Sequence, residues 1–314
     1  MKEAPRERLS DPEYWGDVHG QNPPVVRPTW KNLLRGAVPA RLLEARKRWW
    51  ERQDWKREQR GLREHWIDQL IEVLLRPRWP VNSGGKGLEI GSAPGRVSIE
   101  LWRRLGIVPF GLEYTKAGVQ AQKTLYRRFG LSEDLVMYGD LFDDAWRKPH
   151  AEAFDLVASF GFIEHFGDPG AVLTRHLELL RPGGLLVVTV PNLNDSTWYG
   201  WLVRRFNPAV YAIHNPRTCT REVLAKLASS LGCDIIHCDT LGGPDISFVP
   251  DRRRSSRCVA RLLQIIQPMT NQLNRLYLGT RLKSFPRTAS TLALVAVKKS
   301  KAKGLESDFW GRVR

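Results

Sequence analysis

The sequence predicts an α/β protein built on a parallel sheet that helices cover on both faces. Short apolar segments typical of strands recur along the chain, at Gly87–Gly91, Val108–Tyr114, Leu135–Gly139, Phe154–Phe160, Leu185–Val190, Asp234–Asp239 and Leu292–Val297. Segments of helical character lie between them, near residues 95–105, 115–129, 170–180 and 220–231. Strands that alternate with helices are joined by crossovers, which makes neighbouring strands parallel and buries both faces of the sheet.

Flanking segments divide the chain into three parts. Residues 1–80 are expected to form an N-terminal arm followed by basic, Trp-rich helices, residues 81–300 the main domain, and residues 301–314 a polar tail. Within the first part, apolar residues at helical spacing predict an amphipathic helix over Leu62–Leu75, which Pro77 ends.

Two insertions interrupt the alternation of strands and helices. Residues 192–217 are aromatic and rich in Pro and Asn, and residues 244–290 include a predicted helix near Val259–Ile266. Pro182-Gly183-Gly184 is expected to turn tightly before the buried strand that follows. The insertions are interpreted as cap segments on the main domain.

The bulk composition is that of a globular protein with a sizeable core. The chain has 314 residues, of which 42% are hydrophobic and 26% charged. Its first residues lack the apolar stretch of a cleaved secretory signal, and its longest apolar run, Leu185–Val190, is too short to span a bilayer. The four cysteines form no CxxC pair. We therefore expect a cytoplasmic protein without a structural zinc site.

The segment LEIGSAPG, residues 88–95, has the form of a strand, a tight loop and a helix start. Gly91 permits the turn and Gly95 permits a close approach to a ligand, while free N–H groups at the helix start favour acceptor-rich ligands. Glu89 stands where a dinucleotide-binding loop requires its first glycine, and Pro94 where it requires the third. No Gly-Lys-Ser/Thr follows, which excludes a Walker loop.

Polar residues follow the next strands at the same edge of the sheet. Glu113, 24 residues beyond Glu89, can accept hydrogen bonds from both hydroxyls of a ribose. Asp140 can accept from an adenine amine, with Leu141 offering a backbone N–H, and Ser159-Phe160 ends the fourth strand. Each acidic residue alone could instead cap a helix or stabilise a turn, but their joint placement favours a nucleotide site.

These motifs in order, LEIGSAPG, FGLEYT, YGDLF, FDLVASFGFIEHF and LRPGGLLVVTVPN, resemble those of class I S-adenosylmethionine-dependent methyltransferases. The resemblance implies a Rossmann-like, seven-stranded, mostly parallel sheet with Leu292–Val297 as an antiparallel last strand. It implies S-adenosyl-L-methionine as cofactor. The residues it assigns to the cofactor site are Glu89, Gly91, Ser92, Ala93, Gly95, Glu113, Tyr114, Asp140, Leu141, Ser159 and Phe160. Ser92-Ala93-Pro94 departs from the commoner loop sequences of the family, although its small side chains suit the geometry.

Two histidines are candidates for the chemical step. His165 follows the fourth strand and can act as a general base, or only pack on the cofactor; His214, in the aromatic insertion, is the second candidate. The segment GFIEHF also resembles an E-x-x-E-H loop of ubiquinone-pathway O-methyltransferases that is implicated in metal binding. Because Gly161 replaces its first glutamate, no metal site is expected.

The acceptor side of the site is expected to come from the insertions. The aromatic residues of the first insertion are interpreted as a wall of the acceptor pocket: Trp198, Tyr199, Trp201, Phe206 and Tyr211, with His214. Tyr14-Trp15 is expected to close over the cofactor, as N-terminal aromatic segments do in related enzymes.

The net charge of +16 and the N-terminal tryptophans bear on partners. The charge is compatible with nucleic acid, an anionic membrane or acidic substrates, and equally with an arginine-rich proteome. The adjacent Trp49 and Trp50 cannot share one narrow stripe with Trp55, which favours a lid over a membrane-facing helix. Peripheral membrane contact through these Arg/Trp helices is the second interpretation, and nucleic acid the third.

We therefore expect a methyltransferase that acts on a small or lipid-linked molecule, at oxygen. An RNA or protein methyltransferase is the alternative that the charge suggests, but the fourth strand lacks both the [DN]-P-P-[YFW] tetrad and the catalytic Cys of common base-methylating enzymes. A non-catalytic methyltransferase-like binding protein is a further alternative, which the intact loop disfavours.

Overall fold

The computed structural model describes residues 8–10, 13–15, 64–79, 84–218, 220–245 and 257–299. In this part of the chain a seven-stranded sheet has the order β3-β2-β1-β4-β5-β7-β6. The strands are β1 Lys86–Ile90, β2 Val108–Glu113, β3 Val136–Tyr138, β4 Phe154–Phe160, β5 Leu180–Pro191, β6 Cys233–Leu241 and β7 Thr291–Lys298. β7 pairs antiparallel with both β5 and β6, and the pairs from β3 to β5 are parallel. The predicted fold class is confirmed.

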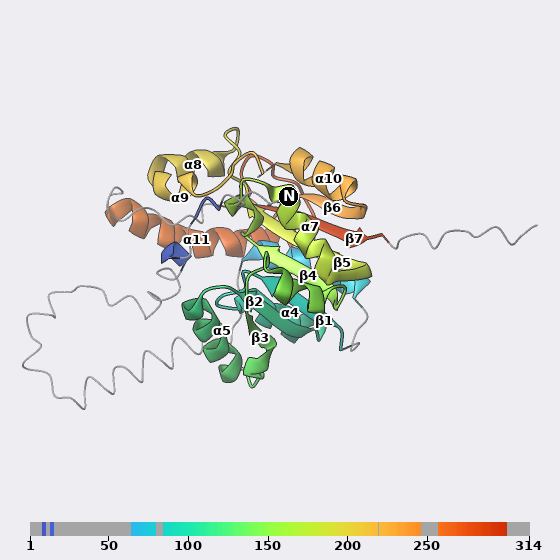
Figure 1. Cartoon of the computed structure of the whole chain (residues 1–314). Helices are drawn as coiled ribbons and strands as arrows, with labels where there is room; N and C mark the ends of the chain where they lie inside the picture. The colour runs from blue at the N-terminus through green and yellow to red at the C-terminus, as the bar shows by residue number, and fades with distance from the viewer. Residues whose placement is uncertain are drawn as a thin grey trace, which may run out of the picture.

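Helices follow the strands and cover both faces of the sheet (Figure 1). The larger ones are α4 Arg96–Leu105, α5 Lys116–Arg128, α7 Pro169–Leu179, α10 Arg221–Ser230 and α11 Arg257–Leu278. The shorter turns are η4 Glu133–Leu135, α6 Asp144–Arg147, η5 Lys148–His150 and η6 Ile163–His165. In Figure 1, β3 and α5 lie at one edge of the sheet and β6 and α10 at the other.

The core is divided by the sheet, because successive side chains of a strand point to opposite faces. On β5, Leu186 and Val188 pack with α7 and α10, whereas Leu185 and Val187 pack with α4 and the N-terminal helical segment. That segment consists of α3 His65–Asp68, the π-helical η2 Gln69–Leu75 and the 3₁₀ turn η3 Arg76–Arg78. Its face of Ile67, Leu70, Ile71, Leu74 and Leu75 is buried. The predicted amphipathic helix is therefore confirmed from residue 65 onward, although Pro77 lies within η3 instead of beyond the helix.

The insertions differ from the sequence prediction in their helices. Residues 192–217 contain two helices, α8 Trp198–Phe206 and α9 Pro208–Ala212, each with a side-chain cap from Thr197 or Asn207. α11 is far longer than the predicted Val259–Ile266. The predicted turn at Pro182–Gly184 lies inside β5, where the register with β4 shifts between Phe154 and Leu156.

Some expectations fall on residues outside the described ranges. These include the basic, Trp-rich helices that contain Trp49, Trp50 and Trp55, and the tail 301–314. Among the helices that the structure does describe, none has the length and apolar character needed to cross a membrane.

Candidate functional site

A cavity lies where the carboxyl ends of β1, β2, β3 and β4 converge, the edge at which open α/β sheets bind ligands. It encloses about 780 Å³ of empty space, part of which is open to solvent. Its lining residues are Arg8, Ser10, Trp15, Ile90, Gly91, Ala93, Leu112, Glu113, Tyr114, Gly139, Asp140, Leu141, Phe160, Gly161, Phe162, His165 and Phe166. All of them precede residue 167.

The glycine loop after β1 is one wall of the cavity. Gly91 has φ +66°, and a Cβ there would lie 2.6 Å from the Phe162 ring, so the loop requires glycine for both conformation and space. Gly95, with φ +89°, is as crowded, but by the Gln122 and Tyr126 side chains of α5. Gly95 therefore allows α4 to pack against α5 and does not line the cavity, unlike the expectation that it adjoins the ligand.

Glu89 lies below the loop and is absent from the cavity wall. Its carboxylate accepts hydrogen bonds from the backbone N–H of Ser98, at 2.9 Å, and from the Ser98 hydroxyl. Burial raises the pKa of Glu89 to about 7, which these two hydrogen bonds oppose. The structure thus differs from the expectation of direct ligand contact: Glu89 satisfies an N–H in the first turn of α4, a group that would otherwise lack a partner.

Two serines assigned to the cofactor are also buried away from the cavity. The Ser92 hydroxyl donates to Gln122 Oε1 at 2.6 Å, which joins the loop to α5. Ser159 is fully buried, and its hydroxyl has no hydrogen-bond partner among the described residues. Sequence reasoning located these residues at the correct strand ends but not the directions of their side chains.

Glu113 and Asp140 do line the cavity, together with Tyr114 and Leu141. Glu113 is 2% exposed, and its Oε1 accepts from the N–H and the hydroxyl of Thr115 at 2.8 and 2.7 Å. Oε2 makes no hydrogen bond to a described residue, which leaves one oxygen for a ligand diol. Asp140 Oδ1 accepts from the Phe142 N–H at 3.0 Å, so this carboxylate also stabilises its own turn.

The N-terminal segment covers the cavity, a feature for which Tyr14-Trp15 was the only signal in the sequence. Arg8 forms an ion pair with Asp140 at 2.6 Å, and its guanidinium lies 4.8 Å from the centre of the Tyr114 ring. The Leu9 N–H donates to the His165 carbonyl, and the Trp15 ring meets the His165 ring edge-on at 5.0 Å. The expectation that Tyr14-Trp15 closes over the site agrees with this position of Trp15.

His165, Glu164 and His214 form a buried cluster beside the cavity. His165 and His214 rings are 4.5 Å apart, and the three side chains can each offer a ligand atom, all within 4.8 Å of one another. Neither oxygen of Glu164 has a hydrogen-bond partner among the described residues. Burial raises the pKa of Glu164 to about 8. Burial, assisted by His214, lowers the pKa of His165 to about 4, so both side chains are mainly uncharged at neutral pH.

The histidine tautomers follow from their partners. His165 Nδ1 lies 2.9 Å from the Ile213 carbonyl, and His214 Nδ1 lies 2.5 Å from the Val210 carbonyl. Because a carbonyl only accepts, each Nδ1 carries the proton and each Nε2 keeps a lone pair. The sequence predicted no metal site because Gly161 replaces a glutamate of the E-x-x-E-H loop. The structure places His214, from a distant segment, beside Glu164 and His165. These three residues could hold a divalent cation.

The aromatic insertion lies outside this cavity. Trp198 and Trp201 are 49% and 40% exposed and stack on each other at the surface, 4.9 Å apart. None of Trp198, Tyr199, Trp201, Phe206, Tyr211 and His214 lines the described cavity. The phenylalanines that do line the cavity are Phe160, Phe162 and Phe166, and sequence reasoning had singled out only the first of them.

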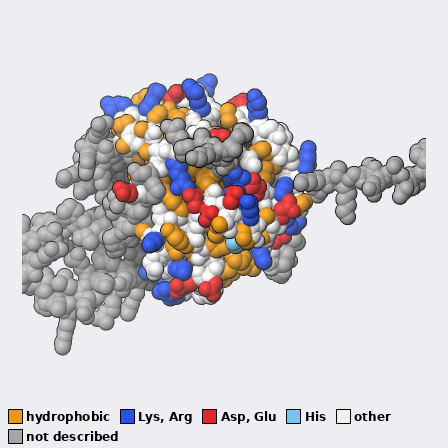
Figure 2. Space-filling view, in the orientation of Figure 1, with side chains coloured by type: hydrophobic (Ala, Val, Ile, Leu, Met, Phe, Trp, Pro, Cys, Tyr) orange, Lys and Arg blue, Asp and Glu red, His pale blue; other side chains and the backbone are white. Residues whose placement is uncertain are grey.

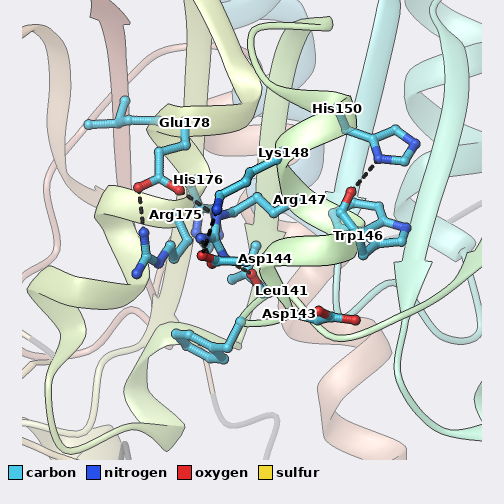
Figure 3. Close-up of polar contacts among 12 residues, drawn as sticks. Leu141, Asp143, Asp144, Trp146, Arg147, Lys148, His150, Arg175, His176 and Glu178 are labelled. Atoms are coloured by element: carbon cyan, nitrogen blue, oxygen red, sulfur yellow. Dashed lines mark hydrogen bonds and ion pairs between the residues drawn. The ribbon is translucent and has the colours of Figure 1, made fainter. Parts of the chain in front are cut away.

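A buried arginine supports the Asp140–Leu141 turn from behind (Figure 3). Arg147 donates to the Leu141 carbonyl at 3.0 Å and to Glu178 at 2.5 Å, and it also binds Asp144. Arg175 holds the other oxygen of Glu178. Figure 3 shows these charged side chains converging between α6 and α7. The network joins α7 to the turn that lines the cavity.

Comparison with known proteins agrees with this geometry. A family model described as a methyltransferase domain matches residues 57–237, more than half of the chain. The chain is 25% identical over 154 residues to the ubiquinone biosynthesis O-methyltransferase of Pseudomonas fluorescens strain SBW25, which covers 48% of this chain and 61% of the relative. It is 28% identical over 116 residues to the ubiquinone biosynthesis O-methyltransferase of Psychrobacter cryohalolentis, and the match covers 37% of this chain and 44% of the relative. The chain thus spans less than two thirds of these relatives.

Among solved structures, the MccD protein superposes with a TM-score of 0.51 at 14% identity, over 75% of this chain and 97% of that one. This likeness concerns the fold alone. The fold and the cavity at its strand ends define a class I, Rossmann-like methyltransferase domain. The chain belongs to the S-adenosylmethionine-dependent methyltransferase family.

The residues present fit the cofactor of that family. Gly91 has no side chain, so the backbone of its loop can approach a ligand closely. The second oxygen of Glu113 can accept from a ribose diol. Tyr114 and Leu141 form apolar walls suited to adenine. Of the predicted cofactor residues, the structure brings together Gly91, Ala93, Glu113, Tyr114, Asp140, Leu141 and Phe160 on one cavity, and not Glu89, Ser92, Gly95 or Ser159.

Proposed function

We propose that this protein transfers a methyl group from S-adenosylmethionine to an oxygen of a small, apolar acceptor, including one linked to a lipid. The observation that carries the proposal is the position of His165, whose ring borders the cavity among Phe162, Phe166 and Trp15. The similarity to O-methyltransferases of ubiquinone biosynthesis supports oxygen as the acceptor atom.

The bound cofactor would supply an activated methyl group on a sulfonium. Glu113, Gly91 and the turn at Asp140–Leu141 would hold it at the strand ends, and Arg8 with Trp15 would exclude water from above. The phenylalanine rings would orient an apolar acceptor, an effect that accounts for a large share of the barrier in displacement reactions.

His165 would act as the base. Its Nδ1 proton is held by the Ile213 carbonyl, so its Nε2 lone pair is the group able to take the proton of an acceptor hydroxyl as the carbon–oxygen bond forms. The lowered pKa keeps this imidazole neutral at pH 7 but makes it a weak base. An acidic hydroxyl, such as a phenol, therefore suits the site better than an aliphatic alcohol. His214 would keep His165 in place and neutral through ring contact.

The test uses the full chain with radiolabelled S-adenosylmethionine and a panel of phenols and catechols, with mass spectrometry of the products. His165→Gln should retain affinity for S-adenosylhomocysteine within about threefold and lose kcat by about 10²–10⁴. His150→Gln is the matched control, because His150 stacks on Trp146 outside the cavity. An unchanged kcat in His165→Gln, or methylation at nitrogen or carbon by the wild-type protein, would overturn the proposal.

A further inference from the structure

Helix α11 exposes several large apolar side chains to solvent. A surface helix usually turns apolar residues to the core and polar residues to solvent. In α11 and the turn after it, the large exposed hydrophobic residues are Leu262, Met269, Leu273, Leu276, Tyr277 and Leu282, which are 56, 61, 50, 70, 79 and 39% exposed. Those from Leu262 to Tyr277 fall within an arc of about 100° at 3.6 residues per turn. They form one continuous outward stripe, here called the α11 stripe.

Besides the buried Leu278, the described part of α11 turns polar side chains inward, and their hydrogen bonds fix this orientation. Asn274, 8% exposed, donates to the Pro244 carbonyl at 3.0 Å. Gln267 donates to Asp245 at 2.5 Å, and Arg275 forms an ion pair with Asp68 at 2.9 Å. Burial of paired polar groups holds the helix firmly, so the apolar stripe is exposed as part of the folded structure.

Basic residues adjoin the stripe where α11 ends. Arg281 and Lys283, directly after the helix, are exposed and have no ion-pair partner among the described residues. A surface of this composition repels a second copy of itself and attracts an anionic partner.

The stripe lies toward the ligand-binding edge of the sheet. α11 connects the end of β6 to the start of β7, and the α8 insertion follows the end of β5; these three strand ends share the edge at which the cavity opens. The Trp198 N–H, at the start of α8, donates to the Arg287 carbonyl at 2.7 Å, which ties the exposed Trp198–Trp201 pair to the segment after α11. Over α8 and α9, Figure 2 shows hydrophobic and basic side chains next to one another.

From these contacts we infer that the α11 stripe is a docking surface for an anionic phospholipid bilayer. Aliphatic side chains in a continuous stripe enter the acyl boundary, while Arg and Lys beside them bind headgroups and tryptophan rings lie at the headgroup level. Nucleic acid is a poorer match, since its recognition uses base stacking on aromatic rings and the stripe is mainly aliphatic. The inference goes beyond the proposed reaction and holds for any acceptor.

The experiment is flotation of the full chain with vesicles of phosphatidylcholine alone or mixed with phosphatidylglycerol. Binding is expected only to the mixed vesicles and is expected to fall as salt is raised. The double variant Leu273→Ser/Leu276→Ser should weaken binding at least about tenfold, because two apolar side chains no longer enter the bilayer. Lys283→Glu should weaken it at least about fivefold, since it removes a basic residue that contributes about 1 kcal/mol near the surface and adds an acidic one.

Matched controls carry the same changes elsewhere. Ile235→Ser alters a partly exposed residue near the start of β6, at the strand ends that face away from the cavity. Lys148→Glu reverses an exposed charge on η5. Both should bind vesicles as the wild type does. Affinity for S-adenosylhomocysteine, measured on each variant, should not change, which separates this test from that of the reaction.

Three results would overturn the inference. The first is absence of flotation with anionic vesicles, and the second is a double variant that floats like the wild type. The third is a wild-type protein that forms dimers which the Leu273→Ser/Leu276→Ser change dissociates, because the stripe would then be covered by a second copy.

Discussion

Arg8 and Asp140, 132 positions apart in the sequence, are joined by an ion pair of 2.6 Å across the mouth of the cavity. The pair fixes the N-terminal segment over the site, because the same guanidinium stacks on Tyr114 while Leu9 bonds to the His165 backbone. Entry and release of a ligand therefore require this contact to open.

The first prediction concerns that contact. Arg8→Ala should weaken binding of S-adenosylhomocysteine about fivefold through faster release, the effect of about 1 kcal/mol expected for a partly exposed pair. Stopped-flow release kinetics measure it. Arg127→Ala, which breaks the exposed pair with Glu133, is the control. Tighter binding in Arg8→Ala would mean that Arg8 competes with the ligand for Asp140.

Glu113 provides the second prediction. Glu113→Gln keeps an oxygen for Thr115 but removes the negative charge, and should lower cofactor affinity about tenfold or more, since hydrogen bonds to charged groups contribute about 1.5–3 kcal/mol. Isothermal titration calorimetry measures the change. Glu133→Gln, at an exposed carboxylate, should have no effect. Equal affinities for both variants would remove Glu113 from the ribose site.

The third prediction tests the buried network of Figure 3. Arg147→Ala should lower the free energy of unfolding by about 3 kcal/mol, because it leaves Glu178 without one partner and the Leu141 carbonyl without its donor. Urea denaturation measures this. Arg175→Ala also removes a partner of Glu178 but does not reach Leu141, and should cost about 1 kcal/mol. An equal loss of unfolding free energy in the two variants would show that the hydrogen bond to Leu141 does not contribute to stability.

The fourth prediction concerns acid stability. Burial lowers the pKa of His176 to about 4 in the folded protein, whereas this histidine has a pKa of about 6.5 in the unfolded chain. Between these two pH values the unfolded chain binds a proton that the folded protein does not bind. Stability is therefore fully present above about pH 6.5 and falls as the pH decreases toward 4, by up to about 3 kcal/mol from this residue. His176→Phe should reduce that slope by one proton, measured by urea denaturation over the same range. An unchanged slope would mean that His176 is already charged in the fold.

The sequence was sufficient for the sheet because strand and turn signals are local. The predicted strands and the helices near 95–105, 115–129, 170–180 and 220–231 agree with the structure to within a few residues, apart from the bulged start of β5. Glu113, Tyr114, Asp140 and Leu141 were predictable for a related reason: parallel strand ends meet at one edge, so a position at a strand end is also a position in space.

Side-chain direction was not predictable from the same signals. Glu89 turns to Ser98, and Ser92 to Gln122, because partners on α4 and α5 happen to lie within reach. Arg8 reaches the site from a distant segment, and no local pattern marks it. His214 was a candidate from the sequence, but its position beside Glu164 and His165 was not predictable. For α11, the amphipathic pattern indicates a helix, but which side faces the protein depends on acceptors such as Asp245 and Pro244.

The division of the chain around residue 167 has a consequence for protein engineering. Every residue of the cavity wall lies before that point, whereas α8, α9 and α11 lie after it. The segment that forms the cavity wall can thus be inherited unchanged while the rest of the chain diverges or is exchanged between homologues. Chimaeras joined within α7 would exchange the α11 stripe, and with it the proposed membrane affinity, without replacing any residue of the cavity wall.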